Sequence, residues 1–393
     1  MRFALVVLAV AACGAPPSPK AAWPSVVTIA GKNAETFGFR DGTGTDALFA
    51  GPEGIAYDAK RDALYVADPA NHAIRRVDLE SMEVTTIAGV GGKAGSNDTL
   101  PGVVALLSWP RSVVLHSKED ALYFTDTGNR TIRRLDLTSM TVTTTFGTAG
   151  QSGTTDGVGP DARFGTSSRF MFWSGGLTLD AENDQLYVAD SANQTLRTMD
   201  LKTRAVSTLI GKPRVLGFQD GAADVATLNK PTGLALDGKG GLYVGDANSL
   251  TLRRVDLASR TISTVGGKAP ADVNTFCEVI SATLPPECEW VDGPVASTRY
   301  RFPFDLLPRG TRGLFVVDSH NNVIRDFDYA TNTVTTVAGT QRTILDDFPH
   351  ASTESTDTEA GTFWHPTHAV FRPPNTLYVS DRAANCIRQV ELR

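Results

Sequence analysis

Residues 64–79, LYVADPANHAIRRVDL, decide the fold of this 393-residue chain. The segments 64–67 and 74–79 combine apolar and β-branched residues in runs of strand length, which predicts two strands. Between them, Asp68 and Asn71 belong to the residue types that favour tight turns. The stretch therefore predicts a β-hairpin, which we call the hairpin module.

The hairpin module occurs six times, and its central aspartates lie 56–72 residues apart. Because the module is preserved while the spacing varies, we expect loops to absorb the length differences. An apolar strand behind a P-x-G turn, or a looser version of that turn, precedes each module, as at residues 52–56, and a β-branched strand ending in Gly follows each of the first five, as at 84–89. Four short strands per unit at this period predict the blades of a β-propeller. The central aspartates are Asp68, Asp126, Asp190, Asp246, Asp318 and Asp381.

The two ends of the sequence predict how the ring closes. The sixth module runs to residue 392 without a following strand, whereas residues 26–31, VVTIAG, match that strand ahead of the first module. We therefore expect an all-β, six-bladed β-propeller of four-stranded antiparallel blades over residues 26–393. Its N-terminal strand would close the last blade and so remove an open sheet edge.

The first residues predict export. Arg2 is followed by an uninterrupted apolar run over residues 3–12. This is the layout of a secretory signal, and the run is too short to span a bilayer. We expect residues 1–12 to be a signal peptide.

Residues 10–13, VAAC, resemble the bacterial lipobox, which implies a lipid on Cys13. Ordinary secretion is the alternative, since Val is less typical than Leu at the first lipobox position. Gly14 differs from the Asp that retains such lipoproteins at the inner membrane, so we expect an outer-membrane lipoprotein facing the periplasm or the cell surface. Residues 13–25 then form the lipidated Cys and a Pro- and Ala-rich tether.

The four cysteines fit an oxidising compartment. Cys277 and Cys288 have ten residues between them in one irregular loop, and we expect a disulfide between them. Cys386 is expected to be a buried thiol.

Charge argues against nucleic acid as a partner. The formal net charge is −6, from 37 basic and 43 acidic residues, with no clustered basic excess that would displace counterions from a polyanion. Arginine pairs such as Arg75-Arg76 recur at one position of the module, which favours a structural role. The repeated Asp and Asn, as in Asp68 with Asn71, are interpreted as turn-capping residues rather than metal ligands.

The repeated motifs resemble a known family. Turns such as Asp41-Gly42, then P-x-G, L-Y-V-A-D, N-x-x-I-R and V-T-T-I-A-G, are similar to the NHL repeat. The resemblance covers residues 26–393 and is closest in character to NHL propellers of bacterial envelope proteins and of teneurins. It implies the six-bladed fold but indicates little about function, since the family holds enzymes, receptors and scaffolds.

The resemblance also implies that ligands meet the face where each innermost strand begins, at the ring of P-x-G turns. Gly is the structural default at the third turn position. The departures from it are Ser112, Asp305 and His368. With Glu53 at a middle position, the catalytic candidates are Glu53, Asp305 and His368. The ligand-binding candidates near this ring are Arg111, Trp109, Trp173, Phe304, His365 and Trp364.

The ring is poorly suited to a metal. Related lactonases hold Ca²⁺ with several carboxylates and Asn amides. Here Glu53 and Asp305 have no Asn beside them, and Arg111 would repel a cation. His365 and His368 come from one strand start, too few for zinc. We expect no metal or other cofactor, with Ca²⁺ or Zn²⁺ at this face as the alternative.

These observations predict a non-catalytic binding or scaffold propeller at the bacterial envelope. Its decorated face would meet a protein, a glycan or a small ligand whose identity the sequence leaves open. The alternative is a hydrolase or lyase, similar to lactonases or to strictosidine synthase, which acts at the channel mouth through Glu53, Asp305 and His368.

Overall fold

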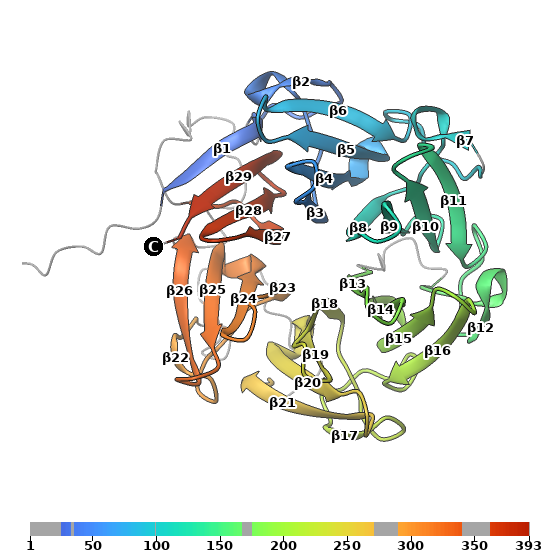
Figure 1. Ribbon diagram of the computed structural model, residues 1–393. Coiled ribbons are helices and arrows are strands. Elements are labelled where there is room, and N and C mark those ends of the chain that lie inside the picture. The colour runs from blue at the N-terminus through green and yellow to red at the C-terminus, as the bar shows by residue number, and fades with distance from the viewer. Residues whose placement is uncertain are drawn as a thin grey trace, which may run out of the picture.

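The computed structural model describes residues 25–32, 35–98, 100–166, 175–270, 290–339 and 362–392. Six antiparallel sheets stand around a central axis, and the first three strands of each sheet run outward from that axis in chain order (Figure 1). The predicted all-β, six-bladed propeller is confirmed. We number the blades 1 to 6 in chain order of their innermost strands.

Each blade repeats the same four strands. The innermost strands are β3 (Ile55–Asp58), β8 (Pro110–His116), β13 (Leu177–Asp180), β18 (Pro231–Leu236), β23 (Pro303–Pro308) and β27 (Pro366–Arg372). The second strands are β4 (Ala63–Asp68), β9 (Ala121–Asp126), β14 (Gln185–Asp190), β19 (Gly241–Asp246), β24 (Gly313–Asp318) and β28 (Thr376–Asp381). The third strands are β5 (Ala73–Asp78), β10 (Thr131–Asp136), β15 (Thr195–Asp200), β20 (Thr251–Asp256), β25 (Val323–Asp328) and β29 (Cys386–Glu391). The fourth strands are β6 (Glu83–Ala88), β11 (Thr141–Phe146), β16 (Ala205–Ile210), β21 (Thr261–Gly267), β26 (Thr333–Gly339) and β1 (Val26–Gly31).

The prediction of four-stranded blades needs one correction, because blades 1 to 5 each carry a short fifth strand at the outer edge. This strand pairs with the fourth strand and comes from the connection that enters the blade. It forms because the entering chain crosses an otherwise open strand edge, and two residues suffice to pair with it. The fifth strands are β2 (Gly42–Thr43), β7 (Leu100–Pro101), β12 (Gly157–Val158), β17 (Gly221–Ala222) and β22 (Gly293–Pro294).

Single 3₁₀ turns join some of these strands. One group follows the fifth strand of a blade: η1 (Gly44–Asp46), η3 (Gly102–Val104) and η4 (Gly159–Asp161). The other group turns the hairpin module: η2 (Pro69–Asn71), η5 (Ser191–Asn193), η6 (Ala247–Ser249) and η8 (Ser319–Asn321). In the described part of the chain, no helix has the length and apolar composition needed to cross a bilayer.

The N-terminal strand closes the ring as predicted. Strand β1 pairs antiparallel with β29, and the register places Val26 opposite Val390 and Gly31 opposite Cys386. Gly31 has a φ of +84°, and a Cβ there would lie 2.5 Å from the Asn385 carbonyl oxygen. Closure therefore needs glycine at the end of this strand.

The hydrophobic core lies between blades. One cluster joins Ile74 and Ala88 of blade 1 to Leu122 and Phe124 of blade 2. Another joins Ile29 of the closing strand to residues of blade 1. Each blade therefore buries its apolar surface against its neighbours, so no single blade has a core of its own.

A buried ion pair stabilises each hairpin module. In the first, the Asp68 carboxylate lies 2.9 Å from the Arg75 guanidinium and also accepts a hydrogen bond from the Asn71 amide. The structural role predicted for the repeated Asp, Asn and Arg is confirmed. The prediction that Asp caps a local turn was incomplete, since Asp68 accepts the N–H of Ala50, 18 residues upstream. The other pairs are Asp126–Arg133, Asp190–Arg197, Asp246–Arg253, Asp318–Arg325 and Asp381–Arg388.

Several predictions concern residues outside the described ranges. The signal peptide and Cys13 with nearly all of the tether precede residue 25, and Cys277, Cys288 and Trp173 also lie outside. Those predictions stand untested. Cys386 is described, and its thiol is buried at the start of β29.

Candidate functional site

Glu53 lies where three blades meet, directly ahead of β3. Its side chain is 2% exposed, and its two carboxylate oxygens face two different guanidinium groups. Oε1 lies 3.1 Å from Nε of Arg382 of blade 6, and Oε2 lies 3.2 Å from Nη1 of Arg111 of blade 2. The start of the first blade is therefore tied electrostatically to both neighbouring blades.

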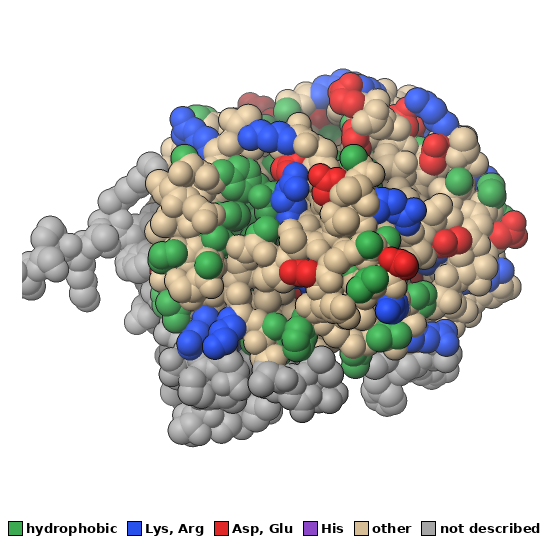
Figure 2. Space-filling view, turned by 90° about the horizontal axis from the view of Figure 1, so that it is seen from below, with side chains coloured by type: hydrophobic (Ala, Val, Ile, Leu, Met, Phe, Trp, Pro, Cys, Tyr) green, Lys and Arg blue, Asp and Glu red, His purple; other side chains and the backbone are tan. Residues whose placement is uncertain are grey.

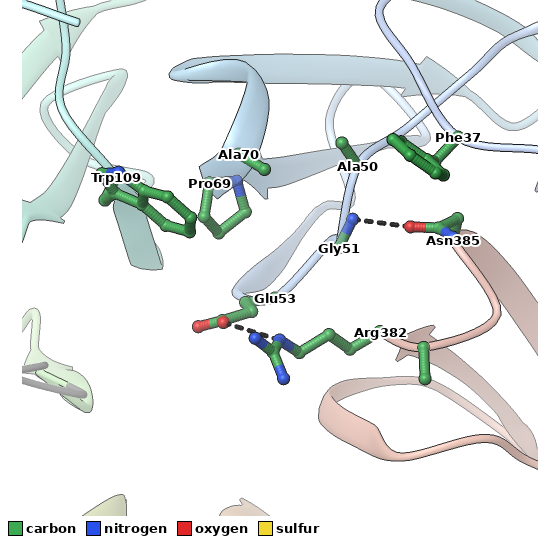
Figure 3. A pocket seen from close by; sticks show the side chains of 10 residues that line it. Phe37, Ala50, Gly51, Glu53, Pro69, Ala70, Trp109, Arg382 and Asn385 are labelled. Atoms are coloured by element: carbon green, nitrogen blue, oxygen red, sulfur yellow. Dashed lines mark hydrogen bonds and ion pairs between the residues drawn. The ribbon is translucent and has the colours of Figure 1, made fainter. Parts of the chain in front are cut away.

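A cavity of about 280 Å³ opens above this cluster (Figure 3). Glu53 and Arg382 lie at its base, Trp109 and Pro69 form one wall, and Phe37 lies on the other side. We call it the Glu53–Arg382 pocket.

The backbone around the pocket is held by hydrogen bonds between blades. Gly51, just before the first P-x-G turn, donates its N–H to Oδ1 of Asn385 at 2.8 Å. Trp109, in the equivalent place of the next blade, donates its N–H to Nδ1 of His72 at 3.1 Å. Gly51 and Trp109 have positive φ, as do the two acceptor residues. The same bond recurs from Lys230 to Gln194 and from His365 to Asn322.

Asp305 occupies the third turn position of blade 5, where β23 meets β27. Its Oδ2 accepts the N–H of Ala369 at 3.2 Å. Burial raises the pKa of this carboxyl to about 7, against weaker opposing hydrogen bonds from backbone amides. Asp305 therefore titrates near neutral pH.

His368, the neighbour of Ala369, is buried on β27. Its ring meets that of Phe304 edge to face, with centroids 5.3 Å apart. Burial, followed by the charge of Arg111, lowers the pKa of His368 to about 3. The imidazole is therefore neutral over the physiological pH range.

The structure thus divides the predicted residues between two neighbouring groups. Glu53 and Trp109 line the pocket, and Arg111 pairs with Glu53. Phe304 packs against His368, and Asp305 binds the adjoining backbone.

A comparison with family models finds no match. Among curated proteins, NHL repeat-containing protein 2 of Gallus gallus is 30% identical over 271 residues, covering 62% of this chain and 36% of the relative. Protein SUPPRESSOR OF QUENCHING 1, chloroplastic, of Arabidopsis thaliana is 27% identical over 299 residues, covering 74% of this chain and 26% of the relative. Teneurin-m of Drosophila melanogaster is 27% identical over 224 residues, covering 53% of this chain and 8% of the relative.

This chain is an NHL-repeat β-propeller. It spans well under half the length of these relatives, from 8% to 36%. An auxiliary nutrient binding protein from Bacteroides thetaiotaomicron matches this NHL propeller with a TM-score of 0.62 at 16% identity, over 93% of this chain and 76% of the other. A gluconolactonase from Xanthomonas campestris matches with a TM-score of 0.52 at 12% identity, over 88% and 87%. At such identities the likeness shows the fold alone.

A second group of aromatic and imidazole rings lies on the same face of the NHL propeller. The ring of His320 stacks on Phe302, with centroids 4.4 Å apart, and lies 4.9 Å from the ring of His365. Burial and, next in size, the positive charge of Arg382 lower the pKa of His365 to about 4. Lys230 and Arg301 act in the same direction on both histidines. The channel mouth therefore has a local positive electrostatic field around His320 and His365.

Trp364 is the remaining predicted residue. Its backbone N–H donates to Oδ1 of Asp381 at 2.7 Å, and its carbonyl accepts from Ala383. The backbone of Trp364 therefore belongs to the turn that holds Arg382.

Arg382 is the residue that the sequence reasoning missed, although a signal existed. It directly follows the central aspartate of the sixth module. The five equivalent positions hold Pro69, Thr127, Ser191, Ala247 and Ser319. A single arginine among small residues at a repeated position marks a specific role.

The opposite end of blades 2 and 3 holds a group with metal-ligand chemistry. Ligand atoms of His116, Glu119 and Asp184 lie within 4.8 Å of one another. However, Nε2 of His116 lies 3.0 Å from Oδ1 of Asp184, and Lys202 lies 2.7 Å from the other oxygen of that carboxylate. The group is consistent with an ion-pair network between blades, as at the Arg61–Asp120 pair of blades 1 and 2.

Proposed function

We propose that this NHL propeller is a non-catalytic binding protein of the bacterial envelope, which holds a small ligand in the Glu53–Arg382 pocket. The observation that carries the proposal is the pairing of Glu53 with two guanidinium groups at the base of an aromatic-walled cavity. Apolar walls with a few convergent polar groups are the usual composition of a ligand site.

The surroundings of Glu53 support binding rather than acid–base chemistry. Each of its oxygens faces an arginine, and its side chain is 2% exposed. A general acid or base must exchange a proton with a substrate within hydrogen-bond reach. Glu53 is therefore suited to holding Arg111 and Arg382 in position.

The size of the pocket limits the ligand. Ligand pockets in proteins commonly measure roughly 300–1,000 Å³. The volume of about 280 Å³ lies just below that range. It suits a monocyclic compound, or one side chain of a larger partner.

Asp305 supports a hydrolase or lyase as the second candidate. A carboxyl with a pKa of about 7 is poised for general acid–base catalysis at neutral pH. His368, on the neighbouring innermost strand, would be the nearby base. A strongly perturbed pKa also arises at purely structural sites, so activity must be measured directly.

The test compares binding and turnover on one purified protein. Saturation-transfer NMR with aromatic acids, amides, amines and monosaccharides should reveal ligands whose signal is lost in Trp109→Ala. Trp290→Ala is the matched control, since that indole is also partly buried but contacts Asp292 at the edge of blade 5. A ligand whose signal persists in both variants would contradict the proposal that it binds in the Glu53–Arg382 pocket.

The catalytic arm uses phenyl acetate and δ-valerolactone, each with and without Ca²⁺ or Zn²⁺. We expect no turnover above buffer. Turnover that disappears in Asp305→Asn or His368→Gln would overturn the non-catalytic proposal.

Envelope location is part of the proposal, and it is supported by the signal-like residues 1–12 and the lipobox-like residues 10–13. A lipid on Cys13 would hold the propeller close to a membrane through the tether. A single acyl chain binds membranes only weakly, so stable anchoring needs more than one chain.

A further inference from the structure

We infer that the Glu53–Arg382 pocket selects a carboxylate carried on an apolar or aromatic body. This inference rests on the proposed function, because it names the chemical class of the ligand at that site.

The first argument is the geometry of Arg382. Its side chain is 42% exposed, and its Nε is directed to Oε1 of Glu53 at 3.1 Å (Figure 3). Within the described ranges, the two terminal amino groups of Arg382 make no hydrogen bond. A guanidinium presents its N–H groups as a planar fork that matches both oxygens of a carboxylate. Arg382 thus retains a fork for an incoming anion after it has bound Glu53.

The second argument is charge. One carboxylate, that of Glu53, faces the guanidinium groups of both Arg111 and Arg382. Burial lowers the pKa of Arg111, Glu53 opposes that shift, and the charge of Arg382 adds to it, so the two cations repel each other. An anion bound to Arg382 would offset this repulsion.

The electrostatic field next to the pocket is also positive. Lys230, Arg301 and Arg382 all lower the pKa values of His320 and His365. The chain as a whole has a net charge of −6, and the outer side of the propeller, seen in Figure 2, shows basic and acidic side chains interspersed. The positive field is therefore a local feature of the mouth, which attracts anions to it.

The order in which an entering ligand meets the two charged groups favours an anionic ligand over a cationic one. Glu53 is 2% exposed, whereas Arg382 is 42% exposed. A ligand that enters the pocket therefore meets the guanidinium before the carboxylate. An ammonium group would be repelled by Arg382 before it reached Glu53.

The third argument is the apolar wall. Trp109 and Pro69 form one side of the pocket, and Phe37, which is 68% exposed, lies on the other side (Figure 3). A bound ring would remove part of the Phe37 and Trp109 surfaces from water, which is favourable. Inorganic phosphate would satisfy Arg382 but leave these surfaces exposed.

The test measures binding by isothermal titration calorimetry of the full chain. The probes are hydrocinnamate, its uncharged amide and inorganic phosphate. We expect hydrocinnamate to bind at least ~10-fold more tightly than the amide or phosphate, because a hydrogen bond between two charged groups is stronger than one to a neutral amide and phosphate lacks the apolar body. N-acetylphenylalanine and its amide form a parallel pair that separates a free acid from the C-terminal carboxylate of a peptide.

Arg382→Ala should weaken hydrocinnamate binding at least ~10-fold and leave the amide unaffected. Arg372→Ala is the matched control. Arg372 belongs to the same blade, is 38% exposed and pairs with Asp62 of blade 1 at 2.8 Å, but lies at the far end of β27. Arg382→Lys, which keeps the charge without the fork, should give an intermediate affinity and covers the case in which the alanine variant fails to fold.

The outcomes separate the two proposals. Equal binding of hydrocinnamate and its amide, both lost in Trp109→Ala, would overturn the carboxylate inference and leave the pocket function intact. Phosphate binding as tight as that of hydrocinnamate would overturn the need for an apolar body. If neither hydrocinnamate nor N-acetylphenylalanine binds, the inference fails. The NMR screen with Trp109→Ala then decides the pocket function independently.

Discussion

The guanidinium of Arg75 lies 2.9 Å from the carboxylate of Asp68, and neither side chain has any exposed surface. Arg75 also reaches Asp41 at 2.7 Å, on the connection that enters the blade. Equivalent arginines in blades 2 to 5 join a hairpin aspartate to an aspartate of the entering connection. The arginine therefore links the connection at the outer edge of a blade to the hairpin module at its centre.

Arg253→Met should lower the free energy of unfolding by about 3–5 kcal/mol, because it leaves the buried Asp246 carboxylate without its partner. Urea denaturation measures the loss. Arg260→Met, which removes an exposed hydrogen bond to the Thr208 carbonyl at the rim, should cost less than about 1 kcal/mol. Equal losses in the two variants would contradict the structural role of the pair.

The double variant Asp246→Asn with Arg253→Met should lose less stability than the sum of the two single variants, since no buried charge then remains at this site. Additive losses would show that Asp246 and Arg253 act independently.

Removal of residues 1–31 should open the ring at blade 6, because β29 loses its partner strand. Hydrogen exchange should then accelerate first in β29 and β28, while blades 2 and 3 keep their protection. Removal of residues 1–24 is the control, since it leaves β1 in place. Uniform acceleration over all six blades would contradict local opening.

Asp305 should make stability depend on pH in the neutral range. Its pKa is raised from 3.8 to about 7 in the folded state, so the native protein holds this proton more tightly than the unfolded chain does. The contribution is fully present below about pH 4 and is lost as the pH rises through about 7. Urea denaturation at about pH 5 and about pH 8 should show a smaller difference for Asp305→Asn than for the wild type. The same difference in both proteins would exclude Asp305 as the source.

His368 should also make stability depend on pH, but in the acid range and in the direction opposite to that of Asp305. Its pKa is lowered from 6.5 to about 3, so its contribution is present above about pH 6.5 and is lost as the pH falls through about 3. His368→Gln should therefore reduce the loss of stability between about pH 6.5 and about pH 4.5. An unchanged acid dependence would place the effect in other groups, such as His365 with its pKa of about 4.

Cys13→Ala should move the protein from the membrane fraction to the soluble periplasmic fraction or the medium, because the variant has no acceptor for the lipid. Immunoblots of fractionated cells measure this. Persistence of the variant in the membrane fraction would contradict lipid anchoring at Cys13.

The blade count and ring closure were predictable because every module carries the same residues at the same places. The short fifth strands were not, since two residues such as Gly42 and Thr43 have no periodicity of their own. They pair only because β6 offers an open edge at that position.

The candidate site was predicted in part. Glu53, Arg111 and Trp109 were identified from the ring of turns, and the structure places all three around one cluster. Arg382 was missed because it lies 329 residues after Glu53 in the chain. Only the closed ring brings blade 6 beside blade 1.

The sequence by itself therefore determined the repeated unit, the number of blades and the strand that closes the ring, because these depend on local residue patterns and their repetition. Only the tertiary structure decided which charged groups meet at the channel mouth. That depends on the order of blades around a closed circle, and on burial, which moves the pKa of Asp305 to about 7 and that of His368 to about 3. Neither property is encoded within a single repeat.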